Sequence, residues 1–514
     1  MSTADTLPTP DEHQATRGAF TSRKVFILAA IGSAVGLGNI WRFPYVAYEN
    51  GGGAFILPYL VALLTAGLPF LLFDYAIGHR YRGSAPLSFR RMRRGAEMLG
   101  WWQVGICAVI AVYYAAIIAW SLRYALFSLD QAWGDDPAAF LTGDFLQVAD
   151  PGMGLDFVPG VLVPLVIVWV VVLAIMLAGV QKGIGATSVV FIPLLVVAFG
   201  VLVIRALFLP GAAAGLNGLF SPNWAALSDT AVWAAAFGQI FFSLSIGFGI
   251  MITYASYVGR RTDMTGSGLV VGFANSGFEL LAGIGVFAAL GFMAQASGVG
   301  VDAVVDQGLG LAFVAFPTII SQAPGGSLIG VLFFGSLVIA GLTSLVSVIE
   351  VVISAVRDKF ALGRVSATLI VGIPASVISV LAFATATGVP ILDTMDHFIN
   401  RFGILLAAVV SMVAVTWIFR DLPGLRAHMN ETGSVQLGRW WVVLVSAVTP
   451  AALMFVLVSE FLDTVATPYG DYPGWFVNVF GWGSAIAVMV VAVVATLIPW
   501  NSQVSLSEPI EEQS

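Results

Sequence analysis

The chain has 514 residues, of which 59% are hydrophobic and only 10% are charged, and its formal net charge is −7. Because a soluble domain carries roughly 25% charged residues, this composition excludes a soluble globular protein and predicts a protein of the lipid bilayer. The single cysteine, Cys107, excludes an intramolecular disulfide. The acidic balance gives no reason to expect a nucleic-acid partner.

Twelve apolar segments follow one another along the chain. Each is long enough for a transmembrane helix, which needs about 20 residues to cross a hydrocarbon core of roughly 30 Å. They cover residues 25–49, 54–78, 98–127, 160–179, 184–208, 231–258, 267–296, 325–356, 363–386, 391–419, 438–461 and 473–498. The sequence therefore predicts an all-α membrane protein of twelve transmembrane helices without a soluble domain. The apolar stretch 309–320 is expected to re-enter the membrane or to cap its outer surface.

The basic residues predict the orientation of these spans. Lys and Arg concentrate in the N-terminus and in alternate connections, whereas the connection 129–157 carries six aspartates and neither Lys nor Arg. The positive-inside rule then places the N-terminus in the cytoplasm, and an even number of spans places the C-terminus there too. Residues 1–16 lack the pattern of a signal peptide and are interpreted as a disordered cytoplasmic tail, with 499–514 as a second tail. Nothing indicates a secretory pathway, which favours the inner membrane of a prokaryote.

Two spans are interrupted in the same way at mid-membrane depth. The first contains Gly32–Asn39 and the sixth contains Ser243–Gly249, each with a Gly-apolar-Gly triplet beside small hydroxyl residues. Since five spans separate the breaks, two repeats beginning at these spans run in opposite directions, which is the pattern of a transporter with a central site. The alternative is that small residues only allow close helix packing. The implied units are a first five-helix repeat, a second inverted one and two C-terminal helices, at residues 17–208, 229–420 and 421–498.

With these breaks the sequence resembles the neurotransmitter:sodium symporter family, in particular its bacterial amino-acid members with the LeuT fold, over about residues 17–420. The motifs that carry the resemblance are Gly32–Pro44, Glu49–Phe55, Tyr113–Tyr114, Gln239–Tyr257 and Ala340–Ser344. The resemblance implies a 5+5 inverted repeat with broken first and sixth helices. It also implies a symporter that imports its substrate with sodium by alternating access.

The resemblance further implies two sodium sites, because unwound helices free backbone carbonyls for a cation. One site would use the carbonyl of Ala34, the side chains of Asn39, Ser243 and Asn275, and the carboxylate of the substrate. The other would use the carbonyls of Gly32, Val35 and Ala340 and the hydroxyls of Thr343 and Ser344. For the last two residues the alternative is a hydrogen bond back to their own helix.

The family pattern also implies a substrate pocket. Its expected residues are Ser33, Ala34, Leu37, Gly38, Ile110, Tyr114, Phe242, Ser243, Ser245, Phe248, Ser344 and Val348. Tyr114 is expected to donate to the substrate carboxylate, and Phe242 and Phe248 to cover the substrate, although aromatic residues in an apolar span are more often core. No acid stands at Ser33 to balance the amine of a substrate without a carboxylate. We therefore expect a neutral, hydrophobic L-amino acid.

Charged residues within spans are candidates for gates, with structural pairing as the alternative. The pairs that match the family are Arg42 with Asp396 on the outer side and Arg17 with Asp358 on the cytoplasmic side. Phe20 stands where the family has a gate Trp. Asp74 is expected to accept hydrogen bonds from amides that the break in the sixth span frees.

Glu279 follows Asn275 by one helical turn. In chloride-dependent members a small hydroxyl residue stands at this position, and chloride is held by matches to Tyr59, Gln239, Ser243 and Asn275. The hypothesis is that the Glu279 carboxylate replaces chloride, so that transport is chloride-independent, and takes up a proton on the return step.

Other functions remain as alternatives. A membrane enzyme is disfavoured, because the four histidines (13, 79, 397 and 428) are scattered and a single cysteine forms no metal-ligand cluster. A substrate sensor on the same scaffold, or a same-fold sodium-coupled transporter of another small solute, stays open. The sequence assigns no oligomeric state.

Overall fold

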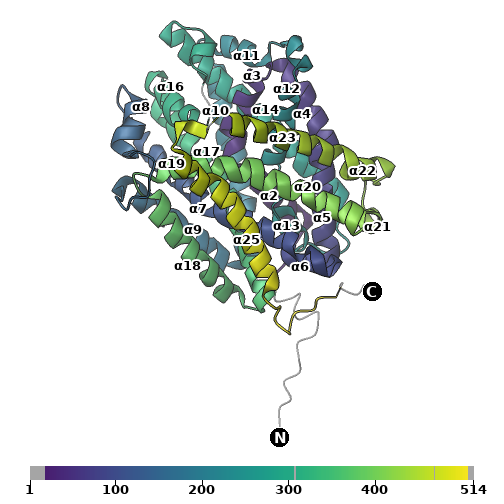
Figure 1. Cartoon of the computed structure of the whole chain (residues 1–514). Coiled ribbons are helices and arrows are strands. Elements are labelled where there is room, and N and C mark those ends of the chain that lie inside the picture. Colours follow the sequence, from purple (N-terminus) through teal and green to yellow (C-terminus); the bar gives the residue numbers. More distant parts are fainter. Residues whose placement is uncertain (1–17, 306–307, 468, 508–514) are drawn as a thin grey trace.

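The computed structural model describes residues 18–305, 308–467 and 469–507 (Figure 1). Within these residues ten helical stretches are long and apolar enough to cross a membrane. They are Gly53–Tyr81 (α4 and α5), Arg94–Phe127 (α7), Pro159–Leu177 (α9), Val180–Leu207 (α10), Met264–Ser297 (α14), Gly326–Phe360 (α17), Arg364–Phe383 (α18), Gly388–Ile418 (α19 and α20), Arg439–Asp471 (α22 and α23) and Gly474–Leu497 (α24 and α25). Each coincides with one predicted apolar segment.

The other two predicted spans are broken. Helices α2 (Arg23–Ala34) and α3 (Leu37–Glu49) meet at an angle of 55°. Taken together they are long and apolar enough to form an eleventh span. Helix α12 (Thr230–Ser243) ends six residues before α13 (Ile250–Ala255) begins, and α12 alone is too short to count as a span. The predicted sixth span, residues 231–258, corresponds to this second broken pair, so the described residues contain up to eleven spans by this measure rather than the predicted twelve.

The breaks follow from local backbone geometry. Val35 and Gly36 adopt extended conformations between α2 and α3, and the Gly36 amide donates to Asn39 Oδ1 at 2.9 Å instead of to a helical carbonyl. Between α12 and α13, Gly247 and Gly249 have φ of +85° and +86°, a left-handed conformation that glycine adopts without a steric penalty. Both breaks therefore lie within the segments that the sequence predicts, and a glycine of each triplet stands directly before the second helix, Gly36 before α3 and Gly249 before α13.

The broken helices lie inside the bundle. Helices α7 and α17 pack along each other, α17 also contacts α2 and α13, and α14 contacts α2 and α3. Helix α7 is the most buried of the ten continuous spans in the described chain, whereas α18 and α25 turn most of their surface outward. A buried scaffold thus surrounds both breaks.

Shorter helices join the spans: α6 (Ala85–Met92), α8 (Pro137–Ala139), α11 (Ala212–Phe220), α15 (Gly308–Gly310), α16 (Phe316–Gln322) and α21 (Leu422–Thr432). The Phe313 ring in the connection before α16 lies against Trp41, Trp120 and Tyr124, with centroids 6.4, 6.2 and 4.9 Å away. This connection therefore covers the ends of α3 and α7, as a cap would.

Both ends of the described chain lie on one side of the bundle. The Phe20 amide donates to the Tyr257 carbonyl, and Arg82 donates to the neighbouring carbonyl of Val258. Arg91 of α6 donates to the carbonyls of Arg82 and, at 2.9 Å, Ser505. This arrangement agrees with termini on the same side of a membrane. The predicted tail 1–16 lies outside the described residues.

Candidate functional site

The two helix breaks face each other at the centre of the bundle. The Ser245 hydroxyl donates to the Ser33 carbonyl at 2.9 Å, which joins the broken sixth span directly to the first. A Cβ atom at Gly38 would lie 2.1 Å from Cε1 of Phe242, so a side chain there would hold α3 and α12 apart. Glycine at this position permits the close approach of the two helices.

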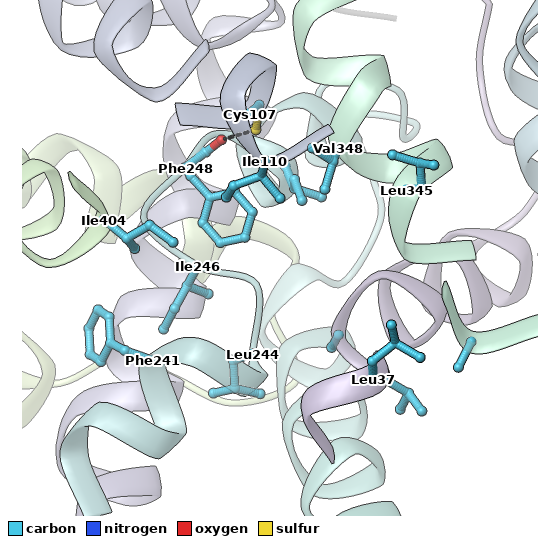
Figure 2. Packing of buried hydrophobic residues seen from close by; sticks show 14 of the residues in the cluster. Leu37, Cys107, Ile110, Phe241, Leu244, Ile246, Phe248, Leu345, Val348 and Ile404 are labelled. Carbon is cyan, nitrogen blue, oxygen red and sulfur yellow. Dashed lines mark hydrogen bonds between the residues drawn. The ribbon is translucent and has the colours of Figure 1, made fainter. Parts of the chain in front are cut away.

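A cavity of about 70 Å³ opens between the breaks, α7 and α17. Its lining includes every residue of the predicted substrate set except Ser243. Four further lining residues, for which the sequence predicts no role, are Gly36, Tyr113, Asn400 and Ile404. Figure 2 shows Leu37, Ile110, Phe248, Val348 and Ile404 approaching from different segments of the chain. The predicted substrate residues are therefore together in space, and their role in binding stays a prediction.

One end of the cavity is polar. The Leu37 amide, at the first turn of α3, donates to the Tyr114 hydroxyl at 3.3 Å. A Cβ atom at Gly36 would lie 3.2 Å from that hydroxyl and 3.6 Å from the Ser344 hydroxyl oxygen. Backbone amides at a helix N-terminus carry partial positive charge, so amide and hydroxyl donors here suit a carboxylate.

The side chains of the predicted first sodium site form one buried chain of contacts. Asn39 Nδ2 donates to Asn275 Oδ1 at 2.8 Å, and Asn275 Nδ2 donates to Ser243 Oγ at 3.1 Å. All three side chains are at most 2% exposed. Amide and hydroxyl oxygens are the hard ligands that sodium needs, so the donor set fits this ion.

The predicted second site lies between α2 and α17. A Cβ atom at Gly32 would lie 3.4 Å from Cβ of Thr343, so these two residues face each other. The Thr343 hydroxyl is 3.0 Å from the Ala340 carbonyl and 3.1 Å from the Ile339 carbonyl, which places its hydrogen toward its own helix. The lone pairs of that oxygen stay available to a cation.

Glu279 is fully buried among hydrogen-bond donors. Gln239 Nε2 donates to its Oε1 at 2.7 Å, and the Tyr59 hydroxyl donates to its Oε2. The Ser276 hydroxyl lies 2.8 Å from the Tyr59 hydroxyl. Two of the four predicted chloride-site residues, Tyr59 and Gln239, therefore contact the carboxylate, as the substitution hypothesis requires.

The two predicted gates differ in the described structure. At the predicted outer gate, Arg42 lies over the Phe242 ring, and Asp396 accepts a hydrogen bond from Asn400 at 2.7 Å. On the other side Phe20 is 5% exposed and packs edge-on against Tyr254 at 5.5 Å. Phe20 is thus buried beside another aromatic side chain.

Two further predicted residues contact backbone amides. Asp358 accepts from the Ser84 amide at 2.9 Å, while its predicted partner Arg17 lies outside the described residues. Asp74 is fully buried and accepts from the Gly247 amide at 3.2 Å, within the break between α12 and α13. The latter contact is the one expected from an acid beside the broken span.

Known proteins resemble this chain over nearly its whole length. An uncharacterized sodium-dependent transporter of Methanocaldococcus jannaschii is 40% identical over 484 residues, which cover 94% of this chain and 97% of that protein. The sodium- and chloride-dependent neutral and basic amino acid transporter B(0+) of Mus musculus is 30% identical, covering 92% of this chain and 84% of that protein.

A solved structure agrees with these relatives. The crystal structure of MhsT in complex with L-phenylalanine matches with a TM-score of 0.74 at 33% identity, covering 87% of this chain and 100% of the MhsT chain. Residues 17–147 and 134–503 match the profile of the sodium:neurotransmitter symporter family. The chain therefore belongs to this family of sodium-dependent membrane transporters and shares the LeuT fold of MhsT.

Proposed function

We propose that this protein imports a neutral, hydrophobic L-amino acid together with two sodium ions across the inner membrane of a prokaryote. The observation that carries the proposal is the cavity between the two helix breaks, polar at Leu37 and Tyr114 and apolar toward Ile110 and Val348. A zwitterion with an apolar side chain complements both ends. L-Phenylalanine, in complex with which the related protein MhsT was solved, is an amino acid of this kind.

The substrate carboxylate has two roles in this proposal. It accepts hydrogen bonds from the α3 amides and from Tyr114, and it completes the oxygen shell of the first sodium ion beside Asn39 and Asn275. Because the substrate carboxylate contacts both the hydrogen-bond donors of the protein and the sodium ion, bound sodium raises the affinity for the amino acid, and bound amino acid raises the affinity for sodium. The residue at position 33 of the cavity lining is a serine, so it has no carboxylate that could replace that of the substrate.

Alternating access would use the two gates. With Phe20 packed at the cytoplasmic side and Arg42 apart from Asp396, substrate enters from outside. Closing of Arg42 toward Asp396 would then cover the cavity, and separation of Asp358 from Arg17 would release the load into the cytoplasm.

The Glu279 carboxylate supplies the negative charge that chloride provides in related transporters, so uptake is independent of chloride in this proposal. After sodium release, Glu279 takes up a proton, because an unpaired buried carboxylate is costly. The proton leaves on the outer side during the next cycle, which makes the protein a sodium symporter with proton antiport.

The driving force is adequate. Two sodium ions that enter and one proton that leaves move one net positive charge inward per cycle, and one charge crossing 100 mV is worth about 2.3 kcal/mol. Each 1.4 kcal/mol is tenfold, so the potential alone supports roughly fortyfold accumulation before the sodium concentration gradient is added.

Uptake into proteoliposomes tests the proposal. The purified protein is reconstituted, and labelled phenylalanine, leucine, alanine and lysine are offered with an inward sodium gradient, with an equal potassium gradient, and with the sodium gradient collapsed by an ionophore. We expect accumulation of one or more neutral amino acids in sodium alone. Sodium-dependent binding without accumulation would indicate a sensor instead, and no response to any amino acid would indicate another solute.

A further inference from the structure

The ring of Phe248 lines the cavity, but its backbone is held from outside the cavity by Cys107. The Cys107 thiol donates to the Phe248 carbonyl with a sulfur–oxygen distance of 3.1 Å (Figure 2). Cys107 is fully buried on α7, and the cavity lining does not include it. The single cysteine of the chain therefore contacts the site through the backbone of one lining residue.

This carbonyl lies outside the regular helices. Phe248 precedes Gly249, the N-cap residue of α13, so its carbonyl comes before the first carbonyl of the helical ladder. A buried carbonyl needs a donor, and the thiol is placed to be one, although S–H···O bonds are weak. Without the thiol, the Phe248 carbonyl would lose this donor.

One neighbour of Phe248 is also held by a hydrogen bond, and the other is closely packed. Asp74 accepts from the Gly247 amide, and a Cβ atom at Gly249 would lie 3.3 Å from Oε1 of Gln103. Gln103 precedes Cys107 by four residues, so both side chains leave the same face of α7. Phe248 thus lies between two glycines, and its carbonyl oxygen accepts a hydrogen bond from the Cys107 thiol.

We propose that Cys107 is a positioning residue that fixes the Phe248 ring and thereby sets the size of substrate side chain that the cavity accepts. The inference rests on the proposed amino-acid transport. The thiol does not touch the substrate. It restrains rotation of the backbone at Phe248, where the flanking left-handed glycines would otherwise let the ring shift toward or away from Ile110.

Three variants test this role in the uptake assay. Cys107→Ala removes the donor, Cys107→Ser retains one, and Ser121→Ala is the matched control. Ser121 is a buried residue of the same helix whose hydroxyl donates only to the Ile117 carbonyl of its own helix, at 2.9 Å. KM and kcat are measured for phenylalanine and alanine.

We expect Cys107→Ala to change the ratio of the two KM values about tenfold, equivalent to about 1.4 kcal/mol, with kcat little changed. Cys107→Ser should restore the ratio, and Ser121→Ala should leave it as in the wild type. Equal changes in both KM values, or a wild-type ratio in Cys107→Ala, would overturn the inference. Transport of no amino acid by the wild type would overturn the proposed function, and this role of Cys107 with it.

Infrared spectroscopy gives a readout that a merely structural cysteine would not move. Because the chain has one thiol, it has one S–H stretching band, which must disappear in Cys107→Ser. We expect this band at the lower wavenumber of a hydrogen-bonded thiol, and we expect it to shift when sodium and phenylalanine are added together. A band at the position of a free thiol would contradict the proposal whatever the transport result.

Discussion

Arg42 lies over the ring of Phe242, with its guanidinium carbon 4.4 Å from the ring centroid. Phe242 also lines the cavity, so the arginine contacts the wall of the substrate site rather than the carboxylate of Asp396. The contact of a guanidinium with an aromatic face is favourable by about 0.5–2 kcal/mol. This free energy is enough to keep Arg42 over the Phe242 ring, yet small enough for Arg42 to leave it during gating. The contact thus suits an open outer gate.

Removing the charge of Arg42 should impair closure more than binding. We expect Arg42→Gln to lower the initial rate of uptake about tenfold or more, because a buried charge pair can no longer form with Asp396. Equilibrium binding of labelled amino acid in sodium should fall much less. Arg42→Lys keeps the charge but lacks the planar group, so an intermediate rate is expected. Wild-type uptake by Arg42→Gln would exclude a gating role.

Glu279 should decide the response to chloride. Replacing chloride with gluconate should leave wild-type uptake unchanged, because the carboxylate between Tyr59 and Gln239 is part of the chain. In Glu279→Ser the same donors face an empty space, and chloride should stimulate uptake about tenfold, the effect of roughly 1.4 kcal/mol. Ser276→Ala serves as the control, because Ser276 also lies beside Tyr59 but its side chain carries no charge. Loss of wild-type uptake without chloride would contradict the hypothesis.

The helix breaks were predictable from sequence because their cause is local. Glycine favours a helix less than most other residues do, and Gly247 and Gly249 have left-handed φ values in the structure. The family pattern then supplied the pocket residues near the breaks. Both kinds of evidence concern short stretches of chain.

Other features of the site depend on contacts between distant segments. Ile404 enters the lining from a π-helical turn, Ile399–Ile404, and hydrophobic periodicity does not reveal such a turn. Asn400 was missed although it follows Asp396 by one turn, a spacing that could have indicated it. The bond from Cys107 to Phe248 joins residues 141 positions apart and has no signature in sequence.

Sodium should stabilise the protein through the asparagine chain. A ligand that binds the folded state at about 100 times its Kd raises the free energy of unfolding by about 2.7 kcal/mol. We therefore expect the melting temperature in detergent to rise with NaCl but not with KCl. Asn275→Ala removes one expected ligand of the first site and both hydrogen bonds that link Asn39 to Ser243, so it should reduce the difference between the two salts to the part that the second sodium site contributes. An undiminished sodium effect in Asn275→Ala would exclude this residue as a ligand.

Asp263, just before the first residue of α14, gives a prediction about pH. Burial raises the pKa of its carboxyl, but hydrogen bonds from Ser434 and from the Gly266 amide outweigh this effect and lower the pKa from 3.8 to about 2. Arg23 adds an ion pair at 3.1 Å. Because the folded-state pKa is the lower one, the carboxylate stabilises the folded state above pH 3.8, and this stabilisation is lost as the pH falls toward 2.

Asp263→Asn should therefore lower the free energy of unfolding by about 1 kcal/mol at neutral pH, because asparagine can still cap the helix but loses the ion pair with Arg23 and the extra strength of hydrogen bonds to a charged acceptor. Thermal unfolding of both proteins in detergent, measured in steps from pH 7 to pH 3, checks this. The difference between them should stay constant from pH 7 to pH 5 and shrink below pH 4, since the unfolded wild-type chain then takes up a proton at this carboxyl while the folded protein does not. Asp421→Asn, which removes a carboxylate that pairs with Arg80 elsewhere on the same side, controls for a general effect of charge. A difference that stays constant down to pH 3, or that grows, would contradict a stabilising carboxylate at the start of α14.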